Sequence, residues 1–429
     1  MTVGASKPVG MDFGTSNSVL ALAKEGQAPD AVQFGGSTNF PSILCFYLDE
    51  DARGEEQVFG VAGADAIATR IKLGADCRLI LSIKSYVANP TFTETNIYGQ
   101  KFSIEDLVAV ILRQMREQAE QTAGPLGASL TSGRPVQFAG FSPDEVLAEK
   151  RLTSAYAKAG FNDVGFAVEP LAAAYAHVQK LEKSETCLVV DLGGGTSDFS
   201  LVRFHPHKDG ENAGPITEPL THSGIGIAGD RLDYRIIQHK ISPLLGQGTH
   251  FTSFGKTLEV PSYIYASFQS WSELSMLKGG RTMSDIEEMR RSAEDAAALE
   301  RLLYIIDNEL GYQLYRAVGE AKAKLSTQDE VAFKFELGPL RLNETIYRKD
   351  FEQWIAPDVA AILRTMEEMF ENANFEFDEV SRVFMTGGTS FVPAIRAEFE
   401  KRFGADKIAT GDEFISVAAG LALLEAERV

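Results

Sequence analysis

The stretch VVDLGGGTSDFSLV, residues 189–202, places three consecutive glycines between two apolar runs. Thr196, Ser197 and Asp198 follow the glycines directly. This interruption predicts a hairpin with an accessible backbone at its tip, because glycine adopts positive φ and lets a ligand approach the chain closely. Successive N–H groups in such a tip can point into one hollow and bind phosphate oxygens. The stretch therefore indicates a phosphate-binding turn.

A second stretch of the same build, VGMDFGTSNSVLAL, spans residues 9–22. Both stretches read as a strand, a glycine turn that contains an aspartate, and a second strand. The repeat predicts two duplicated lobes whose turns face each other and hold a polyphosphate from both sides. The carboxylates of Asp12 and Asp191 would repel phosphate unless a cation lay between them. Mg²⁺ suits this position, since it binds through one or two carboxylates together with phosphates and water.

Neither turn has the sequence of the two most familiar phosphate-binding loops. The Walker loop requires GKS or GKT after its glycines, and neither tripeptide is present. The Rossmann fingerprint requires a helix after the turn, whereas a strand is predicted here. For either turn taken alone, a plain β-hairpin with structural glycines remains the alternative interpretation.

Composition limits the class of protein. The 429 residues exceed what one hydrophobic core organises, so at least two domains are expected. A net charge of −19 argues against binding to duplex nucleic acid, which depends on Lys and Arg. The sequence has no apolar run long enough to predict a membrane span. Three widely spaced cysteines predict a reducing compartment, the cytoplasm, without disulfides.

Strands alternate with helices in both halves, which predicts an α/β architecture. We expect a first lobe over residues 1–200 and a second over residues 201–395, each with a mixed five-stranded sheet and flanking helices. The second lobe contains a helical, charged subdomain at about 231–326. Residues 396–429 are expected to return to the first lobe as C-terminal helices. A nucleotide cleft would then separate the lobes.

Two helix starts in the first lobe carry capping signals. Ser103 precedes a strongly amphipathic segment and has Asp106 three residues later, which predicts a capped helix over residues 103–124. Ser142 is predicted to cap the next helix, over residues 142–160.

Four motifs occur in the order of the actin-like ATPase superfamily: DFGTSNS (12–18), EPLAAAYA (169–176), DLGGGTSD (191–198) and MTGGTSFVP (385–393). Within that superfamily the chain most resembles the nucleotide-binding domain of the heat-shock-70, DnaK-like chaperones. The resemblance covers essentially the whole chain, more weakly over residues 231–310 and 327–380. It implies the actin-like ATPase fold and binding of ATP or ADP with Mg²⁺.

The resemblance also implies roles for charged residues. Asp12 and Asp191 would hold Mg²⁺ through water, and Asp198 would lie near the metal. Lys84 falls where the family places a catalytic lysine that contacts the γ-phosphate and the attacking water. Glu169 falls where the family places a glutamate that orients this water and couples the site to the hinge.

Further residues are expected around the nucleotide from the same resemblance. Those on one side of the phosphates are Gly14, Thr15, Ser16 and Asn17. Those on the other side are Gly193, Gly194, Gly195 and Thr196, of which Thr196 is also expected to act in catalysis with Asp191. Those near the sugar and base are Gly229, Lys322, Ser326, Gly387, Gly388 and Phe391.

Two departures from the family lie on the adenine side. Phe391 stands where the family usually has an arginine, and Gly319 stands where it usually has a glutamate. Nucleotide affinity and base preference are therefore left open by the sequence.

The last departure concerns the C-terminal end. In a full chaperone of this family, an acidic-apolar linker and a peptide-gripping β-sandwich follow the ATPase domain. Only nine residues follow Gly420 here. We therefore expect the ATPase half without the peptide-binding half, as in the bacterial YegD-like proteins.

Four functions are compatible with these motifs: a slow Mg²⁺-dependent ATPase with chaperone-like switching, a nucleotide-gated binding module with little or no hydrolysis, a filament former, and a small-molecule kinase. The helical segment 231–326 favours the chaperone branch over filaments. The EPLAAAYA motif and the absence of an evident substrate loop disfavour the kinase. We expect a nucleotide as ligand and a co-chaperone or client protein as a partner of the second lobe. The client, the hydrolysis rate and the oligomeric state are left open.

Overall fold

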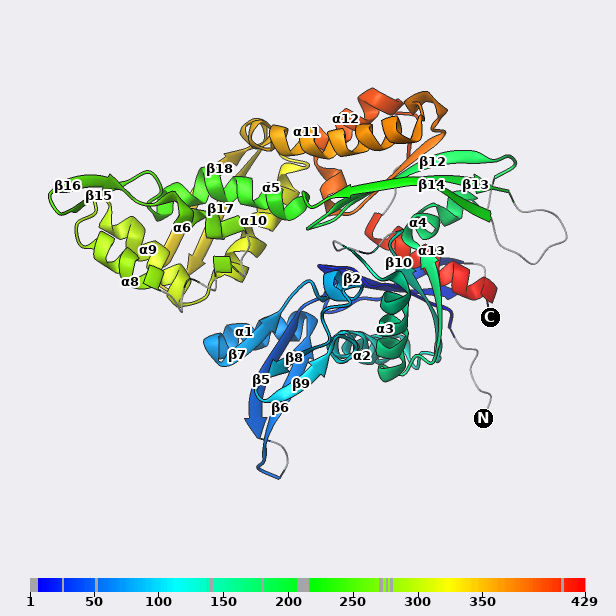
Figure 1. Cartoon of the computed structure of the whole chain (residues 1–429), viewed down its shortest axis with the longest axis horizontal. Helices are drawn as coiled ribbons and strands as arrows, with labels where there is room; N and C mark the ends of the chain where they lie inside the picture. The colour runs from blue at the N-terminus through cyan, green and yellow to red at the C-terminus, as the bar shows by residue number, and fades with distance from the viewer. Residues whose placement is uncertain are drawn as a thin grey trace.

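The computed structural model describes residues 7–24, 27–50, 53–136, 138, 142–178, 181–206, 216–269, 273–274, 277, 281–409 and 413–428. Its elements form two halves that meet at the helices α4 and α13 (Figure 1). Buried apolar side chains form one large cluster in each half. Two separate cores in one chain account for the bilobed shape.

The sheet of the first half mixes parallel and antiparallel pairs. Among the described residues it has six strands, one more than expected, because β4 pairs with β2 beside the order β11-β10-β1-β2-β3. β1 runs antiparallel to β2 and parallel to β10. Nearly every residue of β1 and β2 is buried, because other elements cover both faces of the sheet. The strands are β1 (Val9–Asp12), β2 (Asn17–Lys24), β3 (Gln27–Ala31), β4 (Phe40–Pro41), β10 (Ser129–Arg134) and β11 (Asp163–Val168).

The helices α2 (Ile104–Ala123), α3 (Glu145–Lys158) and α4 (Glu169–Val178) follow in this half. The predicted cap of α2 is confirmed, since Ser103 and Asp106 form a reciprocal capping box. The predicted cap of α3 at Ser142 is wrong. Asp144 caps this helix instead, because its carboxylate accepts the N–H of Leu147 at 2.9 Å.

A smaller unit projects from the first half (Figure 1). Strands β6, β5 and β7 form an antiparallel sheet beside α1, and β8 pairs with β9. The elements are β5 (Leu44–Glu50), β6 (Glu56–Ala62), α1 (Gly63–Leu73), β7 (Cys77–Ile80), β8 (Glu94–Ile97) and β9 (Gln100–Ser103).

The sheet of the second half repeats the central pairing of the first. Its order is β14-β13-β12-β19-β20, with β12 antiparallel to β13 and parallel to β19. Because β12 already belongs to this sheet, the sheet begins at Glu185. Residue 200, the expected end of the first lobe, lies inside β13. The elements are β12 (Glu185–Leu192), β13 (Ser197–His205), β14 (Ile216–Ile225), β19 (Arg382–Thr386), β20 (Ile408–Ala409), α11 (Arg348–Ala373) and α12 (Pro393–Phe403).

The described part of residues 231–326 is mostly helical, as predicted, but it also contains the hairpin β15–β16. This hairpin turns at Phe254 and Gly255, which both have positive φ. A second hairpin, β17–β18, follows the region. The elements are α5 (Gly229–Ile236), β15 (His250–Ser253), β16 (Lys256–Glu259), α6 (Ser262–Ala266), α8 (Arg281–Arg290), α9 (Ala296–Asp307), α10 (Gly311–Leu325), β17 (Glu330–Leu337) and β18 (Leu340–Tyr347).

The C-terminal helix α13 (Glu413–Arg428) joins the two halves at their base. It lies against α4 and the first sheet (Figure 1). Both contacts depend on glycine, because a Cβ at Gly420 would overlap the backbone of α4 at Ala172, and one at Gly10 would overlap α13 at Ala418. The ends of β1 and β12, at Asp12 and Asp191, both line one cavity.

Candidate nucleotide site

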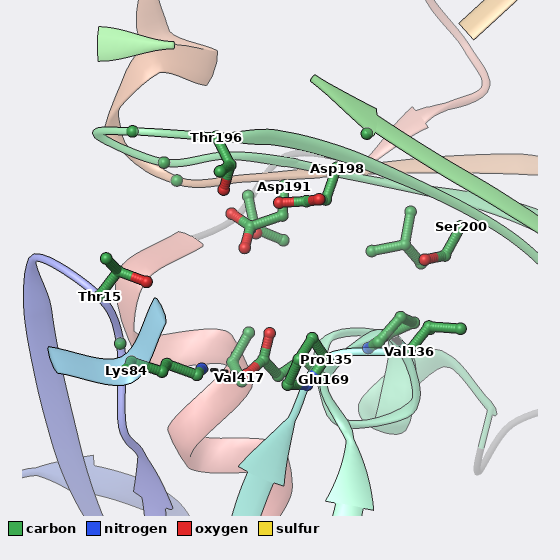
Figure 2. Close-up of a pocket in the computed structure, with 18 of the residues that line it drawn as sticks. Thr15, Lys84, Pro135, Val136, Glu169, Asp191, Thr196, Asp198, Ser200 and Val417 are labelled. Carbon is green, nitrogen blue, oxygen red and sulfur yellow. Dashed lines mark hydrogen bonds and ion pairs between the residues drawn. The ribbon is translucent and has the colours of Figure 1, made fainter. Parts of the chain in front are cut away.

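A cavity of about 740 Å³ lies between the two halves. Both glycine turns line it, together with the loop after β10 and the start of α4. Figure 2 shows Lys84 and Glu169 on one side of this cavity and Asp191, Thr196 and Asp198 on the other. The predicted site residues that line it are Asp12, Gly14, Thr15, Ser16, Asn17, Lys84, Glu169, Asp191, Gly193, Gly194, Gly195, Thr196, Asp198 and Gly387.

The first turn connects β1 to β2. Its N–H at Gly14 donates to the hydroxyl of Ser18 at 3.2 Å, and this hydroxyl lies 2.8 Å from that of Ser42. Both serines are buried. Buried hydroxyl groups of the same half therefore hold this turn in place. Thr15 lies beside the cavity (Figure 2).

The second turn connects β12 to β13 and is closed by a hydrogen bond from the N–H of Gly193 to the carbonyl of Thr196, at 3.0 Å. Two threonines beyond the hairpin hold it. Thr386 donates to the carboxylate of Asp191, and Thr389 donates to the carbonyl of Gly193, each at 2.9 Å. The end of β19 and the residues after it therefore fix the geometry of this turn.

Lys84 and Glu169 form an ion pair at 2.8 Å, with side-chain exposures of 12% and 17%. Burial disfavours the charged amine of Lys84. The carboxylates of Glu169, Asp12 and Asp191 outweigh this effect and raise the pKa of Lys84 above its ordinary value. A largely buried ammonium group, whose charged form these carboxylates favour, thus lines the cavity.

The aspartates on the turns have unusually high pKa values. Burial, with the charge of Glu169, raises the pKa of Asp12 to about 7. Burial, with the charges of Glu169 and Asp198, raises the pKa of Asp191 to about 6. Burial also raises the pKa of Asp198, although a hydrogen bond with Thr196 opposes the shift. Several buried acids around one lysine form a site that a further cation would stabilise.

These acids fit a magnesium ion that is held largely through water. Among the described residues, no group of three or more His, Cys, Asp or Glu side chains is arranged to bind a metal ion directly. Mg²⁺ does not need such a cluster, because it keeps several waters and uses one or two carboxylates with phosphate oxygens. Asp12 and Asp191 offer oxygen donors of this kind beside two turns suited to phosphate.

Five predicted residues lie outside this cavity: Gly229, Lys322, Ser326, Gly388 and Phe391. Lys322 donates to the carbonyl of Gly229 and to the carboxylate of Asp233, each at 2.9 Å. The N–H of Gly229 donates in turn to Gly193 at 3.1 Å, so these residues support the second turn from behind. The side chain of Phe391 is half-exposed.

Sequence reasoning missed the groups that hold the second turn. Thr386 lies in the motif MTGGTSFVP, directly before the glycines to which a role was assigned. Asp233 carries no sequence signal, because its contact with Lys322 joins residues 89 positions apart. Ser200, His222, Pro135 and other unpredicted residues also line the cavity, beyond Asp198.

Two lobes around a cleft, each with a strand–turn–strand motif aimed at that cleft, define the actin-like ATPase class of fold. A comparison with family models narrows this class. The Hsp70 protein family matches residues 8–244 and 300–426, well over half of the chain, and the protein therefore belongs to the Hsp70 family. The fold predicted from the motifs is confirmed. Residues 245–299 lie outside the match.

Membership of the Hsp70 family supports a nucleotide-binding, chaperone-like function, and the family in general binds ATP in a Mg²⁺-dependent manner. In the part of the chain that the structure describes, no helix has the length and apolar character needed to cross a membrane.

Proposed function

We propose that this protein binds ATP with Mg²⁺ in the cavity and hydrolyses it slowly, as the nucleotide switch of a chaperone-like protein. The observation that carries the proposal is the Lys84–Glu169 ion pair, which lies across the cavity from Asp191 and Thr196 (Figure 2). Both groups needed to meet a phosphoryl group and a water molecule thus face the second phosphate turn. The lobes, about 1–200 and 201–395, would move relative to each other at α4 and α13.

Each residue has a defined task in this proposal. The N–H groups of the two turns bind the phosphates, and Asp12 and Asp191 hold the magnesium ion through water. The ion, when bound, neutralises charge on the phosphates. Lys84 offers its ammonium group to the charge that develops on the transferred phosphoryl group. Glu169 keeps Lys84 in place and accepts a hydrogen bond from water, which orients it for attack.

One observation favours a second function, a nucleotide-gated binding module with little or no hydrolysis. On the adenine side, Lys322 is already engaged by Asp233 and Gly229, and Phe391 lies outside the cavity. In a module of this kind the bound nucleotide would set the angle between the lobes. A partner protein would then bind the second lobe with an affinity that depends on this angle.

Turnover by the parent separates the two functions, and turnover by the Lys84→Ala variant tests the catalytic role of Lys84. The variant should hydrolyse ATP at least about 100-fold more slowly, which is the scale lost when one charge-stabilising donor is removed. Its affinity for ATP should change far less, because Lys84 acts on the transition state more than on the bound substrate. Single-turnover hydrolysis and calorimetry measure the two quantities.

Lys101→Ala is the matched control, since Lys101 lies in an exposed ion pair on β9 and should leave both quantities unchanged. An active parent with an equally active Lys84→Ala variant would contradict the catalytic role of Lys84. A parent that binds ATP with Mg²⁺ but does not turn it over would favour the binding module.

A further inference from the structure

Lys84 lies in a segment with little regular structure of its own. It belongs to a short 3₁₀ turn, Ile83–Tyr86, which follows the end of β7 and precedes several tight turns. Ser82, the residue before this turn, has φ of +53°, a left-handed conformation that is costly for a residue other than glycine. Such a conformation persists only where the surroundings impose it. The contacts that hold this segment therefore decide where Lys84 lies.

One buried arginine makes several of these contacts. Arg151, on α3, donates from Nη1 to the carbonyls of Val87 and Asn89, each at 2.9 Å. Its Nη2 donates to the carbonyl of Phe92 at 2.6 Å. Only 7% of the side chain is exposed, and Glu105 lies 3.8 Å from its Nε and balances the charge. A single guanidinium group thus donates hydrogen bonds to three backbone carbonyls of the segment that follows Lys84.

The connection from Arg151 to Lys84 is short. Arg151 holds the carbonyl of Val87, and the N–H of Val87 donates to the carbonyl of Lys84 at 3.1 Å. One residue, Val87, therefore links the guanidinium group to the backbone of Lys84. At its other end, the side chain of Lys84 is held by Glu169. Both the backbone and the side chain of Lys84 are therefore held by contacts, and the contact to the backbone comes from α3 through Val87.

A second residue of α3 contacts the same segment. The N–H of Asp144, the cap of the helix, donates to the carbonyl of Ala88 at 2.9 Å. Asp144 and Arg151 are seven residues apart, so they lie on the same face of the helix, two turns from each other. The segment from Val87 to Phe92 lies along this face. Its position relative to the first sheet is therefore set by a rigid element.

From these contacts we infer that Arg151 is a positioning residue for the proposed hydrolysis, acting through Lys84. Arg151 lines no part of the cavity and touches no group expected to meet the nucleotide. The inference rests on the proposed function, because positioning Lys84 matters to turnover only if Lys84 acts in hydrolysis. A displacement of about 1 Å in a group that acts on the transition state can lower turnover about 100-fold.

Arginine suits this position because its planar group offers several N–H donors in a fixed fork. Lysine offers a single ammonium group on a flexible stem and cannot reach three carbonyls at this spacing in the same way. Arg151→Lys therefore keeps the charge beside Glu105 and loses the geometry of the clamp. It is a milder change than Arg151→Met, which leaves buried carbonyls without a donor.

The test measures turnover, ATP affinity and melting temperature for the parent, Arg151→Lys, Arg151→Met and a control. We expect Arg151→Lys to lower kcat between about 10-fold and 100-fold and to change the dissociation constant of ATP less than about 3-fold. The control is Arg116→Lys on α2. Arg116 also anchors a loop, through the carbonyl of Leu126 at 3.2 Å, and packs on the ring of Phe161, but it has no contact with the segment of Lys84. It should lower the melting temperature without lowering kcat.

The outcomes separate the inference from the function on which it rests. An active parent whose Arg151→Lys variant keeps the parental kcat would overturn the inference alone. A parallel loss of kcat, ATP affinity and melting temperature, or failure of both Arg151 variants to fold, would show a general structural role and overturn it as well. A parent without turnover would overturn the proposed hydrolysis, and the inference with it.

Discussion

The two glycine turns have similar sequences but different environments. In the first hairpin, Asp12 lies opposite Val19, and in the second, Asp191 lies opposite Asp198. The second turn therefore presents two carboxylates where the first presents one. Its hydrogen-bonding partners also differ, because it is held by Thr386 and Thr389 from a distant part of the chain.

Packing around the glycines shows the same difference. A Cβ at Gly14 in the first turn would overlap the backbone carbonyl of Asn17, whereas a Cβ at Gly195 in the second would meet nothing within 4 Å. At Gly194 the two turns approach each other, since a Cβ there would lie 2.9 Å from the hydroxyl of Ser16. The first turn therefore leaves no room for a side chain at Gly14, whereas the second turn leaves room at Gly195.

The largest difference between the turns should come from Gly14→Ala. Because the new Cβ would overlap backbone, the first turn must shift, and we expect the free energy of unfolding to fall by about 2 kcal/mol. ATP turnover should fall about 100-fold, since the shift moves the phosphate-binding N–H groups. Chemical unfolding and single-turnover hydrolysis measure these effects. Parental values in both assays would contradict the close packing assigned to Gly14.

An intermediate effect is expected from pH, through the carboxylates of the two turns. Magnesium requires ionised carboxylates, and the pKa is about 7 for Asp12 and about 6 for Asp191. Both pKa values are raised, so both groups take up protons as the pH falls from 8 to 6. The gain in ATP affinity that Mg²⁺ provides should therefore shrink about 10-fold or more over this range. Calorimetry with and without Mg²⁺ at each pH gives this gain.

Two substitutions test the contribution of each turn to the pH effect. Asp12→Asn and Asp191→Asn should each reduce the change in this gain between pH 8 and pH 6, because each removes one carboxylate with a raised pKa. A gain that stays constant from pH 8 to pH 6 in the parent would contradict the metal role of both carboxylates.

The smallest effect is expected at Gly195. Its φ lies outside the left-handed region and a Cβ there has free space, so alanine fits without strain. Gly195→Ala should leave the free energy of unfolding unchanged or raise it by up to about 1 kcal/mol. If ATP affinity nevertheless falls in this variant, the cause would be contact between the new methyl group and the bound nucleotide. A marked loss of stability would show that the second turn is as crowded as the first.

Local features could be predicted from the sequence alone. The α/β class followed from the alternation of strands and helices, and the cap of α2 followed from Ser103 and Asp106. The hairpin β15–β16 was missed. Its strands are only four residues long, and Phe254 at its turn carries none of the usual turn signals. The cap at Asp144 was missed because Ser142 and Asp144 are both good capping residues at neighbouring positions.

In the candidate site, too, local features could be predicted from the sequence, whereas contacts between distant residues could not. Glycines and aspartates at the ends of strands are local signals, so both turns could be located, while the expected roles of Lys84 and Glu169 came from family resemblance. The contact between Lys84 and Glu169 joins residues 85 positions apart, and that between Thr386 and Asp191 joins residues 195 positions apart. The hydrogen bonds from Arg151 to the segment after Lys84 likewise join residues that are distant in the sequence. Sequence alone determined which residue types stand at each turn, because backbone conformation depends on neighbours along the chain. Only the tertiary structure decided which groups hold them, because hydrogen bonds of 3 Å between distant segments depend on how whole helices and sheets pack.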